Sequence, residues 1–147
     1  MKVKLSKLWN SQKALGALNV IKDLPIKTSY WIGKNTKKIS REVTEIEEKR
    51  KELVKKYGVE NDKKETSVPQ EKMEEFSKEF YDLLDTEIDV DLRIFNIDEF
   101  TGKSGLTGQD MLQIDFLFEE VKETETENVQ KNIYPIKPIK KPKKEVK

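Results

Sequence analysis

The sequence predicts a mainly helical α+β fold, built on an N-terminal antiparallel helical hairpin with a long second helix. Three observations predict it. Apolar residues recur at steps of three and four along residues 5–57, which places them on one face of each helix. A shorter stripe with the same period lies over residues 73–84, and residues 87–94 alternate as a strand does. Charged residues form 39% of the chain and apolar residues 35%, so we expect a modest core.

The first helix is expected from Leu5 to Ile21, with Ser6 available as its cap. Gly16 inside it costs about 1 kcal/mol relative to alanine, which close packing of a neighbour would explain. The link over residues 23–25 is short, and short links favour antiparallel neighbours. We therefore expect the first helix to fold back along the second.

The second helix has three expected boundary markers. Asp23 suits an N-cap, Pro25 suits the first turn, and Gly58 suits the left-handed residue just past the C-terminus. The charged residues 41–52 are interpreted as a solvated face. The predicted packing face consists of Ile32, Ile39, Val43, Ile46, Leu53 and Tyr57. Because this spacing is near the period of a coiled coil, self-association through the face is the alternative to packing within the chain.

A polar loop is expected over residues 58–68, and Ser67 would cap the third helix that follows. The alternating run 87–94 predicts a strand with Ile88, Val90, Leu92 and Ile94 on one face. A lone strand is not stable, so residues 1–5, residues 95–100 or another chain must pair with it.

Thr107 and Asp110 have the spacing of a capping box at the start of a last short helix, which we expect to end near Val121. Beyond it the apolar content falls and charge rises. We expect one domain over residues 1–121 and a flexible Lys/Pro-rich tail over residues 122–147.

The residue types present argue against catalysis. The chain has no cysteine and no histidine, which removes thiolate sites, the commonest general base and the commonest transition-metal ligand. Gly102-Lys103-Ser104 resembles the end of a phosphate-binding loop, but Ile97 stands where that motif needs glycine. We therefore expect no enzyme and no cofactor.

Asp89 and Asp91 form the main candidate metal site. They lie two residues apart on one strand face, so they could share Mg²⁺ or Ca²⁺, with Glu87 as the one obvious third ligand. The solvated face of a half-buried strand explains the same pattern. A metal-dependent enzyme is accordingly the least favoured of three functional interpretations.

The tail carries the clearest charge asymmetry. The whole chain has a net charge of +1, yet residues 131–147 hold seven lysines against one glutamate. Nucleic-acid phosphates or an acidic partner could be contacted by Lys137, Lys140, Lys141, Lys143 and Lys144. A solubilising end without a partner accounts for these lysines equally well.

Five short motifs spread over residues 3–120 carry a family resemblance. They are Lys4-Leu5…Leu8…Ala14-Leu15…Leu18, Leu24-Pro25-Ile26-Lys27…Tyr30, Glu48-Lys49-Arg50…Leu53…Lys56-Tyr57-Gly58, Phe76…Glu79-Phe80…Leu83-Leu84…Glu87-Ile88 and Leu106-Thr107…Asp110-Met111…Ile114…Phe116-Leu117. In order and spacing they resemble a largely uncharacterised group of small accessory proteins of tailed bacteriophages and prophages. The resemblance implies a viral origin and a helical-hairpin fold, and it transfers no catalytic or binding residue.

The expected function is that of a non-enzymatic bacteriophage accessory protein that acts through protein–protein contacts, in virion assembly or on a host factor. The alternative is a nucleic-acid-associated accessory protein that uses the basic tail. Expected partners are a phage or host protein, with a second copy of the chain and nucleic acid as further options. Residues 1–10 lack the apolar core of a signal peptide, and no apolar run reaches the ~18–20 residues of a membrane span. We therefore expect no membrane contact and a place in the host cytoplasm or the virion.

Overall fold

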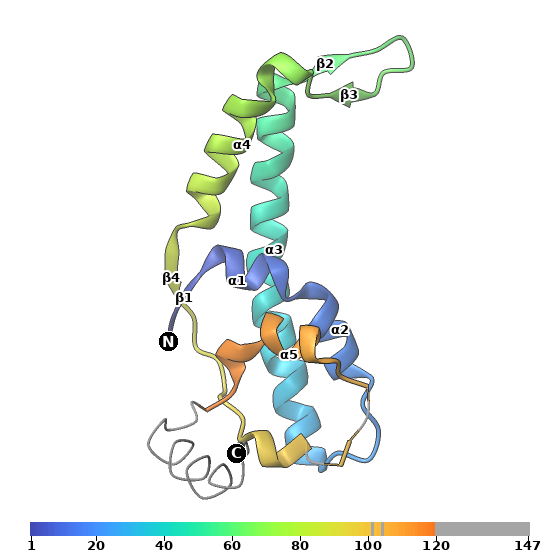
Figure 1. The fold of residues 1–147 in the computed structure, drawn as a ribbon, viewed down its shortest axis with the longest axis vertical. Coiled ribbons are helices and arrows are strands. Elements are labelled where there is room, and N and C mark those ends of the chain that lie inside the picture. Colours follow the sequence, from blue (N-terminus) through green and yellow to red (C-terminus); the bar gives the residue numbers. More distant parts are fainter. Residues whose placement is uncertain (101, 104, 120–147) are drawn as a thin grey trace, which may run out of the picture.

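The computed structural model describes residues 1–100, 102–103 and 105–119, and this part of the chain is mainly helical with two small antiparallel sheets (Figure 1). In chain order the elements are β1 (Lys2–Lys4), α1 (Leu5–Asn10), α2 (Gln12–Asn19), α3 (Ile26–Tyr57), β2 (Val59–Glu60), β3 (Thr66–Ser67), α4 (Gln70–Leu84), β4 (Glu87–Asp89), η1 (Ile97–Phe100), α5 (Gly108–Gln113) and η2 (Asp115–Leu117). The predicted fold class is confirmed.

The expected first helix is broken in two at Ser11. The Ser11 hydroxyl is fully buried and donates to the Leu8 carbonyl oxygen at 2.7 Å, so a side chain takes the place of a helical backbone bond. The break lets α1 and α2 each turn a buried face toward α3. Ser6 is not the cap, because Lys4 is the N-cap residue and its side chain makes no capping bond. Gly16 has no close neighbour, since a Cβ added there would have nothing within 4 Å.

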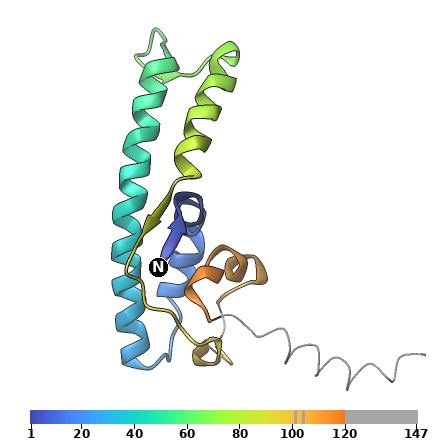
Figure 2. The same ribbon diagram turned by 90° about the vertical axis from the view of Figure 1, so that its left-hand side faces the viewer.

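Helix α3 contains 32 residues and spans about 48 Å. Figures 1 and 2 show α1 and α2 beside its first half and α4 beside its second half, and Figure 2 shows α5 on the far side of α1 and α2 from α3. The expected start was wrong: Asp23 has a left-handed φ of 64°, and Pro25 is the N-cap residue. The proline ring disfavours a helical conformation at Leu24, so the helix cannot begin earlier.

The end of α3 also differs from the prediction. Gly58 has an extended backbone, with φ −84° and ψ 162°, and the expected left-handed cap is absent from this position. The residues after it form the β2–β3 hairpin in place of an irregular loop, closed by the Asn61 side chain, which accepts from the backbone N–H groups of Lys63 and Glu65. Ser67 lies in β3 and Pro69 is the N-cap residue of α4.

Strand β4 pairs with β1, the first of the three expected partners, and Val3 faces Ile88 in the register. The strand ends at Asp89, well before the expected Ile94. Ile94 is 37% exposed and Phe95 is fully buried, so the alternation of inward side chains shifts after Leu92. Phe95 instead exchanges backbone bonds with Leu117 and Glu119 near the end of the described chain.

The core lies between the first half of α3 and the elements that cover it. Its fully buried members include Leu8, Ile39, Phe95, Ile114 and Leu117. The predicted capping box is present, because the Thr107 hydroxyl accepts from the Asp110 N–H and the Asp110 carboxylate accepts from the Thr107 N–H. Helix α5 ends at Gln113, earlier than expected, and Val121 lies outside the described residues.

Replacing Gly58 tests why a glycine stands at this turn. In Gly58→Ala the new Cβ would clash with the Val54 carbonyl oxygen and lie 2.6 Å from Thr66 Cγ2. Since the backbone oxygen cannot easily move, we expect a loss of about 1–3 kcal/mol in the free energy of unfolding, measured in urea. In the control Gly16→Ala the space is open, and a gain of about 1 kcal/mol is expected. An unchanged free energy of unfolding in Gly58→Ala would contradict the steric role of this glycine.

Candidate functional site

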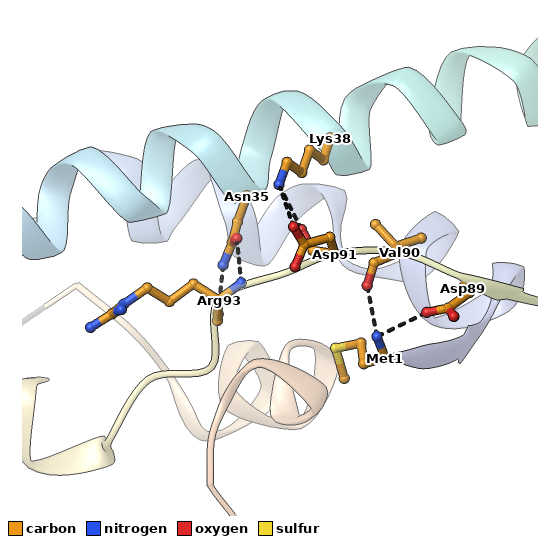
Figure 3. Close-up of polar contacts among 7 residues, drawn as sticks. All are labelled: Met1, Asn35, Lys38, Asp89, Val90, Asp91 and Arg93. Atoms are coloured by element: carbon orange, nitrogen blue, oxygen red, sulfur yellow. Dashed lines mark hydrogen bonds and ion pairs between the residues drawn. The ribbon is translucent and has the colours of Figure 1, made fainter.

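Residues 90–95, here called the strap, contain Asp91, one of the two candidate aspartates, and most of the strand predicted over residues 87–94. The strap runs in an extended conformation along α3 (Figure 3). Its start continues the β1–β4 ladder, because the Val90 N–H donates to the Met1 carbonyl oxygen and the Met1 amino group donates to the Val90 carbonyl oxygen. Beyond this point α3 replaces β1 as the partner of the strap.

Asn35 makes the central contact between α3 and the strap. Its Nδ2 donates to the Arg93 carbonyl oxygen at 2.9 Å, and its Oδ1 accepts from the Arg93 N–H at 2.9 Å (Figure 3). The Asn35 residue is 2% exposed. The amide thus presents the same acceptor and donor pair that a neighbouring strand would present, and it satisfies both polar groups of the Arg93 backbone.

The two aspartates contact different cations. Asp89 Oδ1 accepts from the Met1 amino group at 3.0 Å, whereas Asp91 Oδ2 lies 3.7 Å from Lys38 Nζ, which also donates to the Asp91 carbonyl oxygen. Each carboxylate therefore faces its own cation (Figure 3). Within the described residues no three acidic side chains are grouped to hold a metal ion.

The motif at residues 102–104 has a structural explanation as well. Lys103 Nζ donates to the Asp23 carbonyl oxygen at 2.8 Å, which ties this turn to the α2–α3 link. Gly102 has a φ of 79°, a conformation that suits glycine, and Ser104 lies outside the described residues. The turn is thus bound to the end of the helical hairpin. This hydrogen bond explains the presence of Lys103 without a phosphate-binding role.

The predicted packing face of α3 divides into two parts. Ile32, Ile39 and Ile46 are at most 2% exposed, and Val43 packs half-buried beside them. Leu53 and Tyr57 continue the same stripe but are only half-buried. The boundary falls where α1 and α2 no longer cover α3, and only α4 and the β2–β3 hairpin remain beside it.

We call residues 47–83 the arm: the last third of α3, the β2–β3 hairpin and nearly all of α4. The structure describes every residue of the arm, and none of them is buried. Its half-buried apolar residues face one another along the two helices: Leu53, Val54, Tyr57, Phe76, Phe80 and Leu83. Met73 lies in line with them and is 39% exposed. The arm therefore carries an apolar seam that its two helices cover from one side.

Polar groups frame this apolar seam. Glu79 accepts from the Tyr57 hydroxyl and from Lys56 Nζ, the latter at 2.9 Å. The hydrogen bond from Tyr57 is the main cause that lowers the pKa of Glu79, and the same bond raises the pKa of Tyr57. Beside these groups lies an open hollow of about 410 Å³, whose floor includes Leu53 and Leu83. The arrangement suits a contact surface with a polar rim.

Comparison with known proteins gives no relative: no family model, no curated protein and no solved structure matches this chain. Among the described residues no helix is both long and apolar enough to cross a membrane. The five tail lysines named above lie outside the described residues.

Sequence reasoning missed Asn35, although a signal was present. Asn35 follows Ile32 by three residues and precedes Ile39 by four, so it occupies a position on the apolar stripe. A polar residue at such a position has to find a buried partner. The partner itself, a backbone 58 residues away in sequence, has no local signal.

Removing the Asn35 amide tests its importance to the fold. Asn35→Ala would leave the Arg93 N–H and carbonyl without their partner, so we expect the free energy of unfolding to fall by about 2–3 kcal/mol in urea denaturation. Asn19→Ala is the matched control, because the exposed Asn19 amide also makes two hydrogen bonds, to Leu15 and Thr36. A loss below about 1 kcal/mol is expected there. Equal losses would contradict a special role of the buried pair.

The contact between Tyr57 and Glu79 predicts an acid dependence of stability. Because the folded pKa of Glu79 is lowered, its contribution is present above its ordinary pKa and is lost as the pH falls through the folded value. Wild type should therefore have a higher melting temperature than Glu79→Gln at neutral pH, and the difference should close below about pH 4. The exposed Glu74→Gln serves as control, and a similar closing difference there would argue against the specific contact.

Proposed function

We propose that the protein is a non-enzymatic accessory protein that acts through protein–protein contacts, and that the arm is its docking surface. One observation carries the proposal: 37 consecutive described residues, 47–83, contain no buried side chain, although seven of them, the six half-buried residues named above and Met73, form an apolar seam. From Ile32 to Ile46 the isoleucines of the same stripe are buried. The contrast supports a partner that covers the arm.

Packing explains why the arm needs a third layer. Two antiparallel helices bury only the side chains between them, whereas a helix that is covered from several sides buries a complete stripe. Trp9 of α1 supports the base of the arm with an edge-to-face contact to Phe80, at 5.6 Å between ring centroids. Farther along, α3 and α4 have only each other and the hairpin.

The charges of the arm fit this role. Arg50 pairs with Glu47 and Lys49 pairs with Glu52, at 2.6 Å and 3.0 Å, so these exposed groups are mutually neutralised along the helix. A docking partner would meet an apolar strip between paired charges, as at the core and rim of many interfaces. An apolar helical surface of another protein is the occupant that matches best. A second copy of the chain is the other candidate, because its own seam is apolar and helical.

The viral setting of the proposal rests on the resemblance of the motifs over residues 3–120 to small accessory proteins of tailed phages and prophages. In that setting the partner is a phage or host protein, met in the host cytoplasm or in the virion. The proposal for the arm does not depend on this setting.

A photo-crosslinking side chain placed on the arm tests the docking surface. We expect p-benzoylphenylalanine in place of Met73 to yield one crosslinked species of discrete mass in cells that hold the partner, since Met73 lies on the seam and is 39% exposed. Lys78, exposed on the opposite face of α4, is the control position. The Met73 product should decrease when Leu53→Gln is added, as the hollow then loses apolar contact.

Equal crosslinking from Met73 and Lys78, or a product unaffected by Leu53→Gln, would contradict docking through the seam. A product with twice the mass of the chain, together with dimers in light scattering, would assign the seam to self-association. Circular dichroism should show an unchanged helical signal for each variant.

A further inference from the structure

A basic stripe runs along the outer face of α3. It contains Lys27, Tyr30, Lys34, Lys37 and Arg41, at alternating steps of three and four. All five residues are exposed. With about 100° between successive residues, the stripe lies opposite the buried face of Ile32, Ile39 and Ile46. It therefore points away from the core of the protein.

The charge of this region is of one sign. Residues 24–41 contain five basic residues and no acidic residue, whereas the second half of α3 contains both acidic and basic residues. Lys38 is engaged with Asp91, but the four cations of the basic stripe form no ion pair with any residue that the structure describes. Like charges so close together destabilise a helix slightly. The binding of an anionic partner would offset this repulsion.

We infer that the basic stripe binds the phosphate backbone of single-stranded nucleic acid. From Lys27 to Arg41 it extends about 21 Å, long enough to follow several consecutive phosphates. The residues along one side of it are small, among them Ser29, Gly33 and Ser40, so a strand can approach the helix closely from that side. This site is separate from the basic tail and from the arm, and it goes beyond the proposed docking function.

Tyr30 is the reason to favour a single strand. Its residue is 55% exposed, and Lys34 Nζ lies 5.6 Å from its ring centroid. Trp31 supports the ring edge-to-face at 5.3 Å, and the Arg93 guanidinium lies 5.3 Å from the Trp31 ring centroid. A base released from pairing can stack on such a ring while neighbouring cations hold its phosphates.

An acidic protein is the competing occupant, and the stripe fits it less well. Protein interfaces usually need a desolvated apolar centre. Between Lys27 and Arg41 the outer face of α3 offers only the Tyr30 ring. A phosphate backbone needs no such centre, because counterion release supplies the free energy.

The test measures binding of the full chain to a labelled thymidine oligonucleotide of about 20 nucleotides by fluorescence anisotropy. With four phosphate contacts we expect a slope of about −2.8 for log K against log salt, hence about 50-fold weaker binding between about 50 and 200 mM salt. The stripe variant changes Lys27, Lys34, Lys37 and Arg41 to glutamine. Its slope should fall toward zero.

A charge-matched variant controls for net charge. It changes the exposed Lys51, Lys55, Lys63 and Lys78 to glutamine and lowers the net charge by the same four units. Its affinity and its slope should stay near those of wild type. Tyr30→Leu should weaken single-strand binding about tenfold and leave binding to a matched duplex nearly unchanged. Circular dichroism verifies that all variants remain folded.

Three outcomes would overturn the inference. Equal loss in the stripe and charge-matched variants would reduce the effect to net charge. Loss of binding only when the five tail lysines are changed to glutamine would assign binding to the tail. Tighter binding to polyglutamate than to the oligonucleotide, unaffected by Tyr30→Leu, would assign the stripe to an acidic protein. Loss of salt-dependent binding in the stripe variant alone would support it.

Discussion

The buried amide of Asn35 is the contact on which the arrangement of the other elements depends. A strap that leaves a two-stranded sheet must satisfy its backbone N–H and carbonyl groups before it can be buried against a helix. Asn35 supplies one donor and one acceptor to Arg93, so a side chain of helix α3 makes the hydrogen bonds that a third strand would make. On one side the strap continues the β1–β4 pairing, and on the other it delivers Phe95 to the C-terminal segment. A small sheet therefore suffices for this fold.

The same helix α3 is stabilised in two different ways along its length. Its first half is covered by α1, α2 and the strap, and its buried stripe stabilises the body through apolar burial. Beyond Ile46 it has only α4 and the β2–β3 hairpin beside it, and it relies on half-buried contacts and on ion pairs near the surface, which contribute little each. Such a segment opens more readily than the body. A partner that covers the apolar seam would gain surface burial and order the arm at once.

Much of the fold could be predicted because its signals are local. The helical hairpin, the third helix and the capping box at Thr107 follow from periodicity and spacing. The missed features depend on contacts between distant residues. The strand stops at Asp89 because its partner changes from β1 to α3, and Gly58 is required by the nearness of the Val54 carbonyl oxygen and of Thr66 rather than by its φ. The candidate surfaces were harder still, because periodicity reveals a stripe but cannot tell how much of it a neighbour covers.

Charge is segregated along α3 in a way that packing does not explain. The core constrains only the inner face, so the outer face could have mixed acidic and basic residues throughout, as it does beyond Arg41. In residues 24–41 all of its charged residues are basic, so they repel one another. The basic stripe and the arm lie at opposite ends of one helix of about 48 Å. A polyanion on the stripe would therefore leave the apolar seam open, so a protein partner on the arm and a nucleic acid could be held together by one rigid element.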